Sequence, residues 1–114
     1  MTEAAKPRVD VLVSTFNEER FVEDCLGHVL GQTYDGPYSV WLVDGGSTDA
    51  TVERARRFAD GDERLRILAD GERRNLPESL NVAIPLGDGD LIAKVDAHGY
   101  PALDFVERAV AAFE

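Results

Sequence analysis

Hydrophobic residues in this chain gather in short continuous runs, and each run is followed by a segment in which they recur every three or four positions. The continuous runs predict buried strands at residues 9–14, 38–43, 65–68 and 91–95. The segments with helical spacing predict helices at residues 21–30, 52–59, 77–83 and 104–113. This alternation predicts an α/β fold with a mostly parallel, Rossmann-like sheet and helices on both of its faces.

Polar residues near the predicted helix starts indicate how the helices begin. Asn17 is expected to cap the first helix, and Ser47 or Thr48 the second, because their side chains can accept hydrogen bonds from free backbone N–H groups. Pro77 suits the first turn of the third helix, where a missing N–H group costs nothing.

The composition fits a globular domain and narrows the class of partner. Hydrophobic residues make up 44% of the 114 residues, and 22 acidic against 12 basic side chains give a formal net charge of −10. This balance argues against nucleic acid or an anionic membrane surface as partner, and a phosphate-bearing ligand would need a cation or local basic groups. A lysine-poor, acidic surface suits a salt-loving source, although a GC-rich genome alone explains a bias toward arginine.

The chain is short enough for one domain, with residues 1–8 as a flexible N-terminus and residues 9–114 as the folded part. No apolar run approaches the roughly 20 residues of a membrane span, and the first residues lack the apolar core of a signal peptide. The single Cys25 falls on a predicted apolar helix face, where core packing is expected. A cytoplasmic protein is the expectation.

Polar clusters follow three of the predicted strands directly. Residues 14–18, 44–49 and 96–98 each begin where an apolar run ends. Ligands of open parallel sheets bind outside the carboxyl ends of the strands, so these clusters predict one shared site. Each cluster alone could equally be a turn or a helix cap, and the adjacent arginines 73 and 74 could be a solvated charge run.

Asp96 and His98 carry the strongest candidate chemistry. A carboxylate and an imidazole suit Mn²⁺ well and Mg²⁺ less well, whereas zinc would lack a third His or Cys ligand. Two side chains cannot fill an octahedral ion, so water and substrate phosphates would take the remaining positions. On spacing alone, an aspartate at a turn beside an incidental histidine fits as well. Lys94 is expected at the open edge of the site or paired with Asp96.

Taken together, these stretches are similar to the motifs of a known family. The matching sequences are VSTFNEE at 13–19, VDGGSTDAT at 43–51 and the strand that ends in DAH at 96–98. They resemble the amino-terminal, donor-binding half of the family 2 glycosyltransferases, which have the GT-A fold. RNLPESLN at 74–81, with Lys94 ahead of the acid, is similar to the subset that makes exopolysaccharides such as succinoglycan.

The resemblance implies a set of nucleotide-sugar-binding residues. They are Ser14, Thr15, Phe16, Glu18, Asp44, Arg74, Asn81 and Lys94. Thr15, Phe16 and Glu18 correspond to contacts with the nucleobase and ribose, and Asp44 corresponds to a contact with the nucleoside. The expected donor is a nucleotide-diphosphate sugar, most often a UDP-sugar in this family.

The resemblance also implies the reacting end of the site. Arg74 and Lys94 occupy basic positions near the diphosphate, while Asp96 and His98 match the metal site in its Asp-x-His form, with Mn²⁺ or Mg²⁺ as cofactor. Asp96 is the implied catalytic residue, because the metal would stabilise the leaving diphosphate. The acceptor would be a saccharide or a lipid-linked sugar.

Two positions depart from the family pattern. Gly45 stands where many relatives have a second aspartate, and Phe16 replaces the commoner tyrosine. The resemblance covers about half of the usual catalytic domain, without the later general base, the acceptor site or the Gln-x-x-Arg-Trp signature. We therefore expect nucleotide and metal binding but little sugar transfer by this chain alone.

Two other hypotheses stay open beside the donor half of a sugar transferase. One is a binding-only module that needs a partner chain, and the other is a sugar nucleotidylyltransferase-like enzyme. Against the second, no Gly-rich loop bearing Arg and Lys follows the first strand. A half-domain also exposes a sheet edge, through which two copies could form a homodimer. The full-length parent could be membrane-associated.

Overall fold

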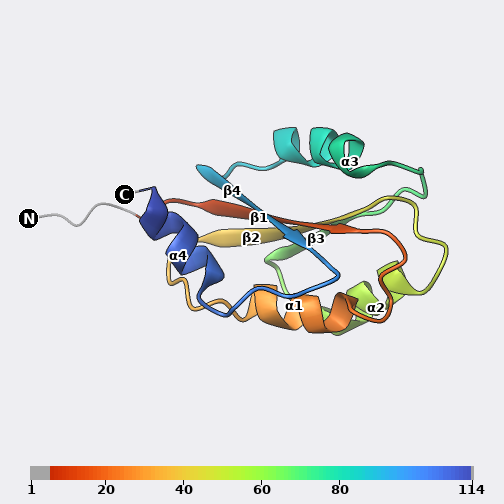
Figure 1. The fold of residues 1–114 in the computed structure, drawn as a ribbon, viewed down its shortest axis with the longest axis horizontal. Helices are drawn as coiled ribbons and strands as arrows, with labels where there is room; N and C mark the ends of the chain where they lie inside the picture. Colours follow the sequence, from red (N-terminus) through yellow and green to blue (C-terminus); the bar gives the residue numbers. More distant parts are fainter. Residues whose placement is uncertain (1–5, 114) are drawn as a thin grey trace, which may run out of the picture.

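The computed structural model describes residues 6–113 and confirms the predicted α/β fold (Figure 1). Its elements are β1 (Val9–Thr15), α1 (Val22–Leu30), β2 (Tyr38–Asp44), α2 (Thr51–Phe58), β3 (Leu65–Leu68), α3 (Leu76–Ala83), the 3-10 turn η1 (Ile84–Leu86), β4 (Leu91–Asp96) and α4 (Phe105–Ala112). None of these helices has the length and apolar character needed to cross a membrane. Of the expected flexible segment 1–8, residues 1–5 lie outside the described part, and Arg8 donates hydrogen bonds to Asp88 and Ser39.

The four strands form one sheet in the order β3-β2-β1-β4, and every neighbouring pair is parallel. β1 and β2 are the two interior strands, and both are buried along almost their whole length. The last residues of β1 pair with both neighbours, so that Thr15 lies opposite Asp44 and Ser14 lies opposite Asp96. The register therefore brings the three predicted polar clusters together at the carboxyl ends of the strands.

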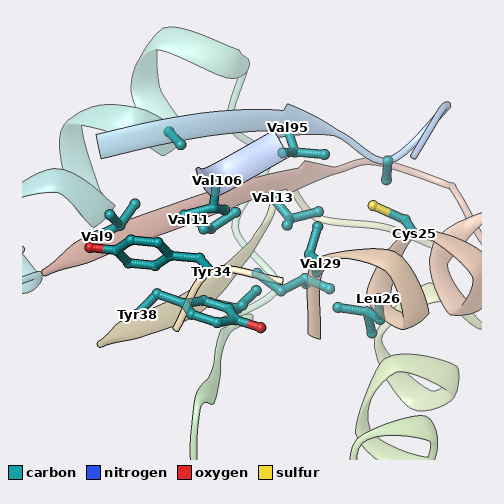
Figure 2. Close-up of a cluster of buried hydrophobic side chains, with 14 of the residues drawn as sticks. Val9, Val11, Val13, Cys25, Leu26, Val29, Tyr34, Tyr38, Val95 and Val106 are labelled. Atoms are coloured by element: carbon teal, nitrogen blue, oxygen red, sulfur yellow. The ribbon is translucent and has the colours of Figure 1, made fainter. Parts of the chain in front are cut away.

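Helices cover both faces of the sheet, unequally, as Figure 1 shows. α1, α2 and α4 lie on one face, over a large cluster of buried side chains that includes Val11, Leu26 and Val106 (Figure 2). α3 lies on the other face over a small cluster built on Leu12 and Val43. Cys25 packs in the larger cluster, as predicted, and burial raises the pKa of its thiol to about 11.

Two of the predicted helix caps are wrong. α1 begins at Val22 without a side-chain cap, and Asn17 instead has a left-handed backbone (φ 52°). α2 begins at Thr51 without a side-chain cap at Ala50, and the Thr51 N–H donates to the carboxylate of Asp49. The side chains of Asn17 and Ser47 do accept hydrogen bonds from backbone N–H groups, as expected. Those N–H groups belong to the other loop, however, and not to the start of the nearest helix.

The start of α3 confirms the sequence interpretation. Pro77 lies in its first turn, and Asn75 and Glu78 form a reciprocal capping box in which each side chain accepts from the other's backbone N–H. This fixes the segment before α3, which approaches the carboxyl ends of the strands.

Candidate functional site

A cavity of about 420 Å³ opens where β1 and β4 end, beside the segment that leads into α3. Its wall is formed by Ser14, Thr15, Phe16, Glu18, Arg73, Arg74, Asn75, Leu76, Ser79, Asp96, Ala97 and His98. Most of the predicted site residues are thus brought together. Asp44, Asn81 and Lys94 lie outside this wall, and Asn81 is exposed on α3.

Asp96 lies at the end of β4 and is held from two sides. Lys94 Nζ donates to its Oδ1 over 2.9 Å, and the Ser14 hydroxyl donates to the same oxygen over 3.3 Å. The hydrogen bond from Lys94 is the main cause that holds the pKa of Asp96 below its ordinary value, and His98 adds to the effect. The predicted Lys94–Asp96 pair is confirmed, and it keeps the carboxylate ionised.

His98 is held by a buried acid and a ring. Its Nδ1 lies 2.6 Å from Oε1 of Glu18, and Phe21 stacks against the imidazole at 5.6 Å between centroids. The side chain of His98 is 77% exposed, whereas that of Glu18 is 9% exposed. The buried carboxylate of Glu18 therefore restrains the otherwise exposed imidazole of His98.

Phe16 lines the cavity with its ring covered on one side. The guanidinium carbon of Arg73 lies 3.8 Å from the ring centroid, which is a close cation–π contact. Arg73 also donates to the carbonyl of Gly45 over 3.2 Å. Arg73 is exposed, as expected of a solvated charge run, yet it also makes these two contacts, and the sequence held no signal for a contact across 57 positions.

Arg74 lies in the wall of the cavity and is paired with Asp70. Two of its nitrogens donate to the two carboxylate oxygens over 2.8 and 2.7 Å, so the salt bridge is bidentate. The same bonds lower the pKa of Asp70 to about 2. Among the described contacts this guanidinium already has an acidic partner, which a diphosphate would have to share or replace.

Asp44 is almost fully buried and is engaged by its own loop. Its carboxylate accepts from the Thr15 hydroxyl, the Gly46 N–H, and both the N–H and the hydroxyl of Ser47, over 2.5 to 3.0 Å. Only 3% of the residue is exposed. Asp44 thus shapes the turn after β2, and its contact with a nucleoside stays a prediction.

The position of Gly45 explains the missing second acid. A β-carbon there would lie 2.6 Å from the carbonyl oxygen of Arg74, and the Arg74 N–H donates to the Gly45 carbonyl. A larger residue would push the segment 70–75 outward, so glycine at this position permits the close approach that closes one side of the cavity.

The loops after β1 and β2 are tied together by reciprocal hydrogen bonds, and we call residues 16–21 and 45–51 the loop pair. Asn17 accepts from the Thr48 N–H and donates its own N–H to Ser47. The Glu18 N–H donates to the Thr51 hydroxyl over 2.8 Å. Each loop satisfies polar groups of the other.

The donor set at the cavity suits a divalent cation only in part. Within residues 6–113 no three His, Cys, Asp or Glu side chains lie close enough to enclose a metal by themselves. Asp96 and His98 supply one ionised carboxylate and one imidazole. Both hydrogen bonds to the carboxylate end on Oδ1, so Oδ2 is the oxygen open to a ligand. This pair fits a cation whose remaining positions are filled by water and phosphate.

The fold and the cavity define an α/β protein of the GT-A type with a polar site at the strand ends. The chain belongs to the glycosyl transferase family 2, whose family model matches residues 10–114. It is similar to glycosyltransferase AglE of Haloferax volcanii, with 34% identity over 105 residues, which cover 91% of this chain and 34% of that protein. The chain therefore spans about a third of the length of this relative.

Two solved structures have the same fold. The mannosyltransferase PcManGT from Pyrobaculum calidifontis, in complex with GDP-Man and Mn²⁺, matches with a TM-score of 0.82 and 34% identity, over 92% of this chain and 32% of that one. Glucosyl-3-phosphoglycerate synthase from Mycobacterium tuberculosis, in complex with Mn²⁺ and UDP, matches with a TM-score of 0.76 and 24% identity, over 94% and 39%. The second likeness concerns the fold alone.

Proposed function

We propose that this chain forms the donor-binding part of a glycosyltransferase that transfers sugar from a nucleotide-diphosphate donor. The observation that carries the proposal is the convergence of Asp96, His98, Arg74 and Phe16 on one cavity at the strand ends. The likeness to PcManGT, whose structure contains GDP-Man and Mn²⁺, supports it.

Two groups of side chains at the cavity suit the nucleobase and the diphosphate of such a donor. Phe16 and Arg73 offer a stacked aromatic and guanidinium surface for a nucleobase. Arg74 in the cavity wall, and Lys94 beside Asp96, are the basic side chains proposed to face the diphosphate, which would share them with Asp70 and Asp96. Ser14 and Thr15 also line the cavity, at the end of β1.

Asp96 and His98 are the residues that would hold a divalent cation, either Mn²⁺ or Mg²⁺. Such a cation would neutralise the diphosphate and stabilise the charge of the leaving group. Lys94 favours the ionised form of Asp96 by lowering its pKa, and the ionised form is the one that ligates a cation. The chain spans about a third of the length of a relative such as AglE, so the step proposed for these residues is donor binding.

The finer features of the function are proposals as well. A role in exopolysaccharide synthesis rests on the similarity of the stretch 74–81, with Lys94, to one subset of the family. A UDP-sugar donor and a saccharide or lipid-linked acceptor rest on the resemblance to the family as a whole. A salt-loving source and a cytoplasmic location rest on the net charge of −10 and the apolar pattern.

A homodimer through β4 is a further proposal. β4 is an edge strand among the described residues, and Ile92 on it is 49% exposed. Light scattering that finds only monomer at high protein concentration would reject this proposal.

Calorimetric titration of UDP and GDP into the chain, with Mn²⁺ and then with EDTA, tests the proposed function. We expect metal-dependent binding that Asp96→Ala and His98→Ala each weaken by about tenfold or more. His28→Gln is the matched control, because His28 lies on α1 away from the cavity wall. Absence of binding by the folded wild-type chain would contradict the proposal.

A further inference from the structure

Glu18 is a buried carboxylate without a structural reason for its burial. The residue is 7% exposed, and its Oε2 has no hydrogen-bond partner among residues 6–113. Burying a charged oxygen in this way is costly unless a partner compensates for the lost hydration. The helix does not need the side chain either, because the N–H groups of Phe21 and Val22 donate to the backbone carbonyl of Glu18.

The backbone of Glu18 is fixed from both sides, so its side chain has a defined direction. Its N–H donates to the buried Thr51 hydroxyl over 2.8 Å, and its carbonyl accepts from the start of α1. The loop pair therefore holds the carboxylate in place before any ligand arrives.

The other carboxylate oxygen points to His98. A separation of 2.6 Å between Oε1 and Nδ1 is favourable only with a proton between the two atoms, because two lone pairs would repel. Phe21 stacks on the imidazole at an interplanar angle of 26° and restrains the ring plane. With Nδ1 facing the acid, Nε2 is the ring nitrogen left for a ligand.

We propose that Glu18 is a positioning residue that holds His98 with its proton on Nδ1 and presents Nε2 to the cation and diphosphate. The proposal rests on the proposed function and deepens it, since it gives Glu18 a role behind the metal ligand instead of a contact with the nucleoside. A carboxylate behind a ligating histidine fixes the tautomer and the ring orientation. The other ligand, Asp96, is likewise held by a neighbour, since Lys94 donates to its Oδ1.

The test compares three variants of the chain by two measurements. Glu18→Leu removes the acceptor at similar size, Glu18→Gln keeps an acceptor oxygen, and Glu23→Leu changes an exposed glutamate on α1 as the matched control. Long-range ¹H–¹⁵N spectra of the chain with labelled histidine, at about pH 8, report which nitrogen of His98 carries the proton. Release of free Mn²⁺, followed by electron spin resonance, reports the affinity for the metal alone.

The wild-type chain is expected to have the Nδ1 proton. Glu18→Leu is expected to lose that preference and to weaken Mn²⁺ binding about tenfold to a hundredfold. Glu18→Gln and Glu23→Leu are expected to stay close to the wild type in both measurements. This pattern separates positioning from a general loss of structure, because a purely structural defect would not be restored by an acceptor oxygen.

Two results would overturn the role of Glu18: a wild-type His98 protonated on Nε2, or a folded Glu18→Leu variant with unchanged tautomer and Mn²⁺ affinity. If Glu18→Leu does not fold, the wild-type tautomer decides. Failure of the proposed function is distinguishable, since it would appear as no Mn²⁺ or nucleotide binding by the wild-type chain itself.

Discussion

Asp44 and Asp96 end the two strands that flank β1, yet the structure uses them differently. Asp44 is 3% exposed and accepts four hydrogen bonds from its own loop and from Thr15. The side chain of Asp96 is 66% exposed and has one oxygen open beside the cavity. An aspartate at a strand end is therefore not by itself a ligand residue. What matters is how many donors the surrounding chain directs at it.

The largest effect expected from this comparison is on stability. Asp44→Ala would leave two hydroxyls and two N–H groups without their acceptor in a buried turn, which should lower the free energy of unfolding by about 3 kcal/mol. Asp96→Ala is the matched control and should change stability by less than about 1 kcal/mol, because its position is exposed. Urea denaturation of both variants measures the difference. Equal losses would contradict the distinction between the two residues.

A smaller effect is expected one residue further along the same turn. Gly45→Ala places a β-carbon 2.6 Å from the carbonyl of Arg74, and relief of that clash should cost about 2 kcal/mol. At Gly99 a β-carbon meets nothing within 4 Å, so Gly99→Ala should be neutral or slightly stabilising. Denaturation curves that shift equally for the two variants would show that the segment 70–75 does not press on Gly45.

The smallest effect concerns the ionisation of Asp96. Lys94→Met removes the main cause of its lowered pKa, so this pKa should rise toward 3.8. Because the folded-state pKa is lowered, the pair contributes stability above the ordinary pKa and loses it as the pH falls through the folded value. The exposed position makes this contribution small.

Carboxyl ¹³C titration measures the Asp96 pKa directly. Lys6→Met is the matched control, since Lys6 pairs with Asp35 on another part of the surface. It should leave Asp96 unchanged and raise the pKa of Asp35 instead. An Asp96 pKa that does not move in Lys94→Met would mean that Ser14 or the fold, rather than Lys94, sets it.

Much of the fold could be predicted because strand burial and helix periodicity are local in the sequence. The run 9–14 forms a strand buried on both faces, and the alternation of elements correctly predicted parallel pairing. The location of the site at the carboxyl ends of the strands was predicted from the same parallel arrangement. The pairing of Lys94 with Asp96 was also predictable, since residues two apart on a strand share a face.

The failures all involve contacts between loops. Asn17 was expected to cap its own helix, but its left-handed backbone turns the side chain toward Thr48. Asp44 differs, since three of its four hydrogen bonds come from Gly46 and Ser47 in its own turn and only the bond from Thr15 is long-range. The stacking of Arg73 on Phe16 depends on where two loops far apart in the sequence meet.

The loop pair has a consequence for how the cavity admits its ligand. Residues 16–21 and 45–51 are bonded to each other by reciprocal hydrogen bonds. Segment 70–75 is bonded to them differently, because its described hydrogen bonds to these two loops all end on the carbonyl of Gly45. One wall of the cavity is therefore pre-organised, and the facing wall is tethered to it by the bonds to this one carbonyl and by the stacking of Arg73 on Phe16. The entropy lost when a ligand binds falls mainly on that tethered wall, so changes in residues 70–75 should alter the rates of entry and release more than the chemistry of recognition.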